Sequence, residues 1–303
     1  MNDSAQISAI HATAESDKEP LDCRAPDKTT SLPREARLPI NRCNLPAAIL
    51  GGLTFQQKPA ALELDGVATL YAGLFKRLDL VDQAAERGRI FRDYLTVHFR
   101  LERLEDAGLQ EDGQRNGKQR AKANWMRTVR GWSFNADSRE GAVLKGWVES
   151  RFGLLPRHHI EPLRNYSEPA YRRYLEMRSA GLYGTNALEA QLDLLYSYCQ
   201  YEFGREVPRR SHITLYRGIN RIGEQEILEA GQTGNSDPIV LLNSLNSFTS
   251  SRERADEFGD YILETRVPTA KLLFHCQLLP DVLKGEDEYL VIGGVYAAKI
   301  KTY

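Results

Sequence analysis

Cysteine and long apolar runs are scarce in this chain, and each shortage excludes a class of protein. Of 303 residues only 4 are cysteine, and they form no Cys-x-x-Cys pair and no cluster with zinc-ligand spacing. No segment approaches the roughly 18 consecutive apolar residues of a membrane helix. The N-terminus lacks the basic start and apolar core of a secretory signal. We therefore expect a cytoplasmic protein with free thiols, no bound metal and no membrane span.

An excess of one charge sign and the common nucleotide-binding and hydrolase signatures are also missing. The formal net charge is −1 and the isoelectric point is near 6.6, so no global field attracts the protein to nucleic acid. The sequence has no Gly-x-Gly-x-x-Gly fingerprint, no P-loop and no Gly-x-Ser-x-Gly elbow. The apolar share of 42% and the charged share of 27% are ordinary for a globular protein.

The chain divides into three parts that differ in composition and in the spacing of their apolar residues. Residues 1–38 are polar and contain few large apolar side chains, which predicts a disordered or loosely docked arm. Apolar residues recur at helical spacing over 67–78, 90–104 and 188–199. After residue 211 the pattern changes to short strands at 213–216, 239–242, 261–267, 271–276, 289–292 and 295–300. We expect an α+β fold in which residues 39–303 form one domain, helical over 39–210, with a mostly antiparallel or mixed β core over 211–303.

The most informative residues are two carboxylates at the start of a predicted strand. Glu286 and Glu288 stand two residues apart just before an apolar run, so both side chains point to one face while Asp287 points elsewhere. Two like charges in one site are unfavourable unless a cation or a reaction uses them. The alternative is a solvated acidic turn after Gly285.

An arginine and a group of hydroxyls precede this pair. Arg217 ends an alternating strand, where a guanidinium can grip a pyrophosphate through paired hydrogen bonds, and Gly218 would let a ligand approach closely. The alternative is an exposed arginine before a turn glycine. Further on, Ser250 and Glu253 have the spacing of a helix capping box. Ser250 can also orient a neighbouring carboxylate, and the two roles are compatible.

An arginine on a strand, then hydroxyls, then Glu-x-Glu on a strand is the order found in arginine-directed mono-ADP-ribosyltransferases, which bind NAD without a dinucleotide fingerprint. From Arg42 to Tyr303 the chain resembles the dinitrogenase reductase ADP-ribosyltransferase family, through segments 45–51, 186–189, 212–218, 243–259 and 286–293. The resemblance implies transfer of ADP-ribose from NAD to one arginine of dinitrogenase reductase, which reversibly switches off nitrogen fixation. It also implies regulation by a P-II signal protein.

The resemblance further implies roles for the residues of the NAD site. Arg217 would hold the NAD phosphates, with Gly218 also at the NAD, and Ser250 matches the central serine that keeps the catalytic glutamate in place. Because this chain has Phe-Thr-Ser-Ser where relatives often show Ser-Thr-Ser, Thr249 and Ser251 stay open as alternatives. Thr249 and Phe248 are placed at the NAD, with Phe248 either beside the nicotinamide ring or in the core.

The two glutamates would divide the reaction between them. Glu288 matches the catalytic glutamate, which stabilises the positive charge that develops on the ribose. Glu286 matches the upstream glutamate of arginine-directed members. It would orient the incoming protonated guanidinium and accept its proton.

Three other functions stay open. The enzyme can act on another arginine or on water as an NAD glycohydrolase, or the chain can be a non-catalytic interaction protein on the same fold. A nucleic-acid-binding module around residues 115–132 ranks last, although six basic residues stand there beside Trp125 and Trp132. The pair His158-His159 lacks partners at metal spacing, and we expect it at the surface.

Overall fold

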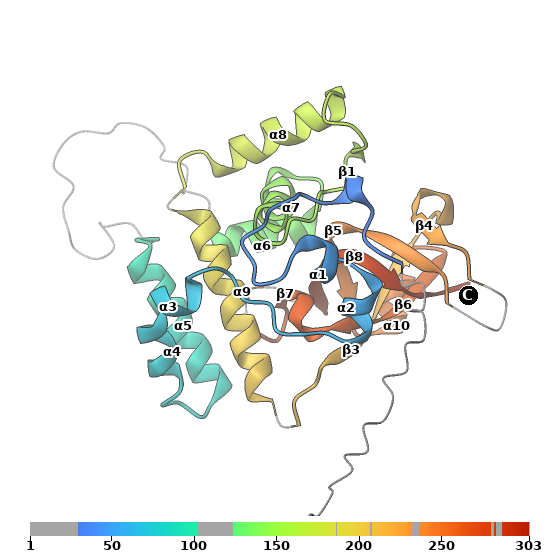
Figure 1. Cartoon of the computed structure of the whole chain (residues 1–303). Coiled ribbons are helices and arrows are strands. Elements are labelled where there is room, and N and C mark those ends of the chain that lie inside the picture. Colours follow the sequence, from blue (N-terminus) through green and yellow to red (C-terminus); the bar gives the residue numbers. More distant parts are fainter. Residues whose placement is uncertain are drawn as a thin grey trace, which may run out of the picture.

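The computed structural model describes residues 30–101, 124–185, 187–206, 208–231, 237–279, 282 and 287–302. Within these ranges the chain runs from helices into strands, which confirms the predicted α+β class (Figure 1). The first part holds a short 3-10 helix, a small hairpin and nine α-helices: η1 Arg34–Ala36, α1 Ala47–Leu50, α2 Leu53–Gln57, α3 Val67–Leu70, α4 Ala72–Leu78, α5 Ala84–His98, α6 Trp125–Phe134, α7 Arg139–Phe152, β1 His158–His159, β2 Glu161–Pro162, α8 Pro169–Leu182 and α9 Leu188–Arg205.

The second part of the described chain is a seven-stranded sheet in which every registered pair is antiparallel. Its order is β7-β8-β5-β3-β6-β9, and β4 pairs with β5 outside this path. The elements are β3 His212–Ile219, η2 Ile222–Glu224, β4 Glu226–Glu229, β5 Ile239–Thr249, α10 Arg252–Asp256, β6 Tyr261–Pro268, η3 Thr269–Lys271, β7 Leu272–His275, β8 Glu288–Ala297 and β9 Lys299–Thr302.

The helical spacing of apolar residues predicted some helices and missed others. The segment 67–78 is helical but is divided at Tyr71, and the helix expected over 90–104 begins earlier, at Ala84. Helix α7 was not predicted because most of its residues are buried, including Lys145 and Arg151, so it shows no single apolar stripe. Its start is marked by Ser138, whose side chain accepts a hydrogen bond from the backbone N–H of Gly141.

Strand β8 is one long strand over a region where the sequence pattern predicted parts of two strands, 289–292 and 295–300. It continues through Gly293 and Gly294, where its register with β5 shifts between Leu242 and Leu245. A Cβ atom on Gly293 would lie 1.7 Å from the carbonyl oxygen of Asn243, and Gly294 has a φ of +114°. The glycines therefore allow β8 to pass this irregularity without ending.

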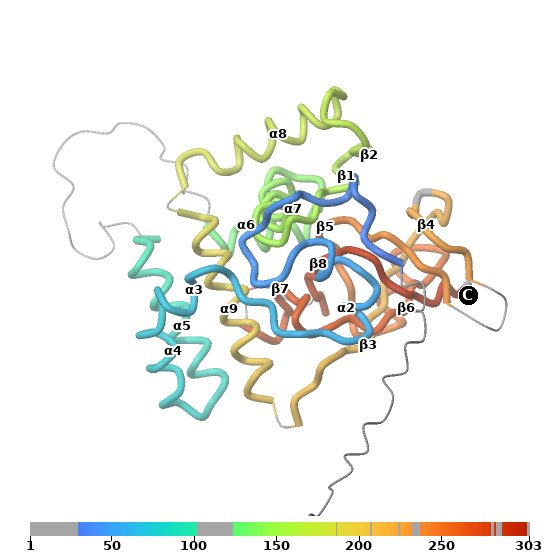
Figure 2. Tube along the Cα trace, viewed as in Figure 1, coloured from blue at the N-terminus to red at the C-terminus, as the bar shows by residue number. Residues whose placement is uncertain are grey.

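Most helices share one hydrophobic core with the sheet, whereas α8 packs on α7 around a small second cluster that includes Tyr171 and Tyr174. Figure 2 shows α9 between the α3–α5 group and the sheet, and α9 packs on β7. Residues 30–38, which we expected in the N-terminal arm, pack against this core, with Leu32 and Ala36 buried and the Leu38 N–H bonded to the Gly153 carbonyl. The rest of the predicted arm, residues 1–29, lies outside the described residues. Among the described helices, none is both long and apolar enough to cross a membrane.

Candidate active site

Glu288, the first residue of β8, has a carboxylate that is held at both oxygens. Only 8% of the residue is exposed. Its Oε1 accepts a hydrogen bond from Ser247 Oγ at 2.6 Å, and its Oε2 accepts one from Ser133 Oγ at 2.5 Å. Hydroxyl donors to a carboxylate form short, charge-assisted hydrogen bonds. The side chain therefore lies in a defined position at the edge of the core.

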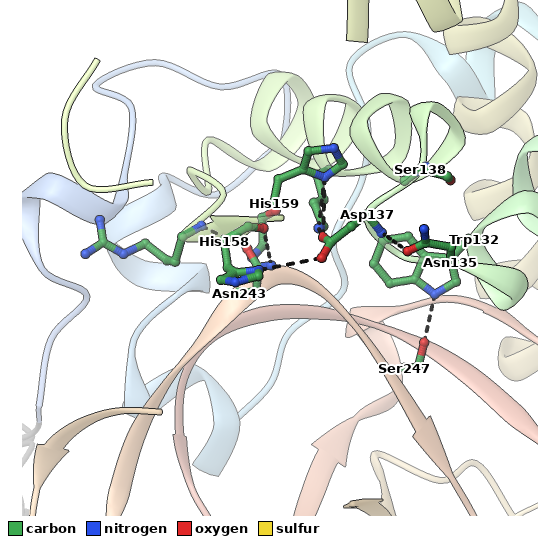
Figure 3. Close-up of polar contacts among 12 residues, drawn as sticks. Trp132, Asn135, Asp137, Ser138, His158, His159, Asn243 and Ser247 are labelled. Carbon is green, nitrogen blue, oxygen red and sulfur yellow. Dashed lines mark hydrogen bonds and ion pairs between the residues drawn. The ribbon is translucent and has the colours of Figure 1, made fainter. Parts of the chain in front are cut away.

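Ser247 on β5 connects Glu288 to the helical part of the protein. Its Oγ accepts a hydrogen bond from Trp132 Nε1 at 2.8 Å, and Figure 3 shows the indole directed at Ser247. Because an indole N–H can only donate, the hydroxyl proton of Ser247 is left for Glu288. Trp132, 2% exposed, and Ser133 both come from the last turns of α6.

Arg217 on β3 approaches the same group from another strand. Its Nη1 donates to the backbone carbonyl of Ser247 at 2.8 Å. Burial lowers the pKa of Arg217, while the negative charge of Glu288 acts in the opposite direction. The structure thus brings Arg217, Ser247 and Glu288 together, and two of these three were predicted as site residues.

The prediction that Ser250 contacts Glu288 is wrong. Ser250 directs its hydroxyl and its backbone N–H to the carboxylate of Asp287, which also accepts from Thr249 Oγ1 at 3.0 Å. These hydrogen bonds lower the pKa of Asp287 even though burial acts to raise it. The serine on Glu288 is Ser247, because Thr249 pairs with Glu288 across the two strands and Ser247, two residues earlier, has the same face.

The expected capping residue is also displaced by one position. Ser251, not Ser250, caps α10, since its Oγ accepts from the N–H of Arg254 at 3.1 Å. Ser251 also donates to Glu253 at 2.9 Å. The capping explanation therefore applies to Ser251, and Ser250 serves to join the end of β5 to the start of β8.

Phe248 and Gly218 have structural roles here. Phe248 is 3% exposed and pairs with the buried Tyr289, so it packs in the core, which was the alternative to a place beside a ring of the substrate. A Cβ atom on Gly218 would lie 2.1 Å from the Ala255 carbonyl oxygen. Gly218 therefore allows the close approach of α10, and its place at the NAD stays a prediction.

Glu286, the other predicted carboxylate, lies outside the described residues. Asp287, between the two glutamates, has partners other than those of Glu288: its carboxylate accepts from Thr249, Ser250 and Cys276.

A buried cation next to the site was not predicted. Lys145 on α7 is 2% exposed, and its Nζ lies 2.8 Å from Asp137 Oδ1 and 3.2 Å from His159 Nδ1. Burial lowers the pKa of Lys145, and the charge of Arg217 lowers it further, while Asp137 opposes both. Asp137 lies beside His158 and His159 in Figure 3.

His159 is therefore not the surface residue that the sequence suggested. It is 2% exposed, and burial, followed by the charge of Lys145, lowers its pKa to about 4. A neutral imidazole can accept a hydrogen bond from the Lys145 ammonium. His158 does lie at the surface, as expected. Among the described residues no group of three or more His, Cys, Asp or Glu side chains could hold a metal ion.

The aromatic residues of the basic stretch are not available for base stacking. Trp125 and Trp132 are both 2% exposed, and residues 102–123 lie outside the described ranges. The described part of this stretch therefore offers no aromatic platform of the kind that single-stranded nucleic acid needs.

Comparison with known proteins gives a single consistent result. The model of the dinitrogenase reductase ADP-ribosyltransferase family matches residues 40–300. A NAD(+)–dinitrogen-reductase ADP-D-ribosyltransferase from Rhodospirillum rubrum is 38% identical over 261 residues, which cover 86% of this chain and 93% of the relative. No solved structure matches the chain. The chain belongs to the dinitrogenase reductase ADP-ribosyltransferase family.

Proposed function

We propose that this chain is an NAD-dependent protein-arginine mono-ADP-ribosyltransferase that modifies dinitrogenase reductase and thereby switches off nitrogen fixation. One structural observation carries the chemistry: the carboxylate of Glu288 is held by Ser247 beside Arg217. The family match and the printed name of the Rhodospirillum rubrum relative support NAD as donor and dinitrogen reductase as acceptor.

The described residues fit NAD as a substrate. Arg217 uses one guanidinium nitrogen on the Ser247 carbonyl, and a guanidinium has about five N–H donors, so donors are left for a pyrophosphate. Glu288 accepts two hydroxyl hydrogen bonds in the structure, and a carboxylate offers about four acceptor positions. One of the others can receive the ribose 2′-hydroxyl.

The main catalytic task falls to Glu288. Cleavage of the nicotinamide–ribose bond develops positive charge on the sugar, as in glycoside hydrolysis. A carboxylate fixed beforehand stabilises that charge without having to reorganise during the reaction. Loss of such a group costs about 3 kcal/mol or more in the transition state. Ser247 and Trp132 keep the carboxylate in place, and Arg217 positions the donor.

We assign the acceptor side of the reaction to Glu286. The guanidinium of an acceptor arginine has a pKa above about 12 and arrives protonated, so it is a poor nucleophile. A carboxylate orients it by charge-assisted hydrogen bonds and accepts its proton as the new bond forms. Support for this role comes from the position of Glu286 two residues before Glu288.

The remaining parts of the proposal concern cellular setting and extent. We infer a cytoplasmic enzyme that is regulated by a P-II signal protein, as the family resemblance implies. We also infer that residues 39–303 act as one domain. The support for that inference is the core that helices and sheet share and the family match over 40–300.

The test combines labelled NAD, purified dinitrogenase reductase and two variants, with and without P-II protein. Wild-type protein should label the reductase and release nicotinamide. Glu288→Gln should abolish both activities, whereas Glu286→Gln should lose labelling and retain nicotinamide release. If nicotinamide were released but the reductase stayed unlabelled, with and without P-II protein, the assignment of dinitrogenase reductase as acceptor would be wrong. Equal loss of both activities in both variants would contradict the separate roles of the glutamates.

A further inference from the structure

Three residues near the end of helix α6 donate hydrogen bonds to the two proposed catalytic strands and to the connection between β7 and β8. Ser133 Oγ donates to Glu288 Oε2 at 2.5 Å, Trp132 Nε1 donates to Ser247 at 2.8 Å, and Arg130 Nε donates to the carbonyl of Val282 at 2.8 Å. Val282 lies in the connection between β7 and β8, so α6 holds both the start of β8 and the segment that leads to it. The contacts are polar and specific, which mere core packing does not require.

From these contacts we infer that Ser133 is a positioning residue for catalysis, acting through the second oxygen of Glu288. This inference rests on the proposed function, in which Glu288 is the catalytic carboxylate. The residues of the predicted arginine, serine and glutamate pattern all lie after residue 211, so Ser133 would be a contribution from the helical part of the chain.

A second hydroxyl has a distinct physical effect on a glutamate. The last torsion of a glutamate side chain is broad and roughly two-fold, so a single hydrogen bond fixes one oxygen but not the plane of the carboxylate. Ser247 on Oε1 and Ser133 on Oε2 together fix that plane. The oxygen that must face the developing charge on the ribose is then in place before the substrate binds.

The helix that carries Ser133 is itself well anchored. Asn124 caps its start by accepting from the N–H of Arg127, and Trp125 and Trp132 are buried. Phe134, which directly follows Ser133 and is the last residue of α6, is 91% exposed to solvent. Ser133 thus sits at the boundary between the rigid core and the solvent side of the site.

The experiment compares Ser133→Ala with Ser133→Thr and with Ser138→Ala as a matched control. Ser138 is five residues away and caps α7 through the Gly141 N–H, so its loss affects stability and not Glu288. Rates of nicotinamide release and of reductase labelling are measured over a range of NAD concentrations, together with the melting temperature of each variant.

We expect Ser133→Ala to lower kcat for both activities by about 10-fold to 150-fold, the range that one hydrogen bond to a charged group supplies. The KM for NAD should change less than about threefold, because Ser133 does not hold the donor. Ser133→Thr, which keeps a hydroxyl, should restore most of the rate. Ser138→Ala should melt at a lower temperature with an unchanged kcat.

Several results would overturn the inference. An unchanged or raised kcat in Ser133→Ala would show that the hydroxyl is dispensable or restrains Glu288. A loss of rate that Ser133→Thr does not restore would point to packing instead of the hydrogen bond. If the wild type neither released nicotinamide nor labelled the reductase, the proposed function would fail first and this inference with it.

Discussion

Replacement of Ser247 by alanine tests the assignment of the serine role most directly. The Ser247 hydroxyl on β5 donates a hydrogen bond to Oε1 of Glu288, and it also accepts one from the buried Trp132 indole. The variant removes both hydrogen bonds and leaves the strand register and the neighbouring Arg217 contact with the backbone unaffected. Ser250→Ala is the matched comparison, because Ser250 has a hydroxyl on Asp287 instead.

The expected magnitudes follow from these contacts. A hydrogen bond to a charged group contributes about 1.5–3 kcal/mol, and each 1.36 kcal/mol is about tenfold in rate, so Ser247→Ala should slow nicotinamide release by about 10-fold to 150-fold. The unpaired indole N–H of Trp132 should lower the free energy of unfolding by about 1–3 kcal/mol. Ser250→Ala should stay within a few-fold of wild type, since Asp287 keeps its hydrogen bonds from Thr249 and the Ser250 N–H.

The assay is the initial rate of nicotinamide release at saturating NAD, with urea unfolding of the same samples. The rates should rank wild type and Ser250→Ala together, well above Ser247→Ala. If Ser250→Ala were the slower variant, the role would return to Ser250 and the contacts in this structure would not describe the active state. A full rate in Ser247→Ala would refute the view that Oε1 of Glu288 must be held.

Three further predictions concern other positions. Trp132→Phe keeps an aromatic ring in the core but removes the N–H donor to Ser247, so kcat should fall several-fold at unchanged KM in the same assay, and the smaller ring should also lower the free energy of unfolding. Gly218→Ala places a Cβ atom 2.1 Å from the backbone of Ala255 and should destabilise the protein by about 1–3 kcal/mol in urea unfolding. Burial lowers the pKa of Lys271 to about 7; the unfolded chain therefore binds more protons between about pH 7 and pH 10.4. The contribution of Lys271 to the free energy of unfolding should therefore increase as the pH rises through that window. Between pH 7 and pH 9 the wild type should show this increase and Lys271→Met should lack it.

The sequence was sufficient for the parts of the fold that have a clear period. Alternation located the strands around Arg217 and Glu288, and the order of the motifs led to the family. These features are local, so a short window of residues contains all the information that they need.

The parts that the sequence did not reveal depend on register and on distant contacts. Ser247 lies near the end of β5 and Ser250 directly follows that strand, and the pairing of Thr249 with Glu288 is what distinguishes the two hydroxyls. Ser133 and Lys145 come from helices whose patterns carry no mark of a site, and α7 is buried on nearly every side.

The hydrogen bonds that link α6 to the catalytic strands join residues far apart in the chain. Ser133 and Glu288 are separated by 155 positions, and Trp132 and Ser247 by 115. Contacts of such long range form late in folding, because the entropy of closing large loops must be overcome first. A partly folded chain, or a native chain whose α6 opens transiently, therefore keeps its sheet but holds its carboxylate loosely. In a denaturant titration, catalytic activity should disappear before the sheet unfolds, so that enzymatic competence reports on the docking of one helix.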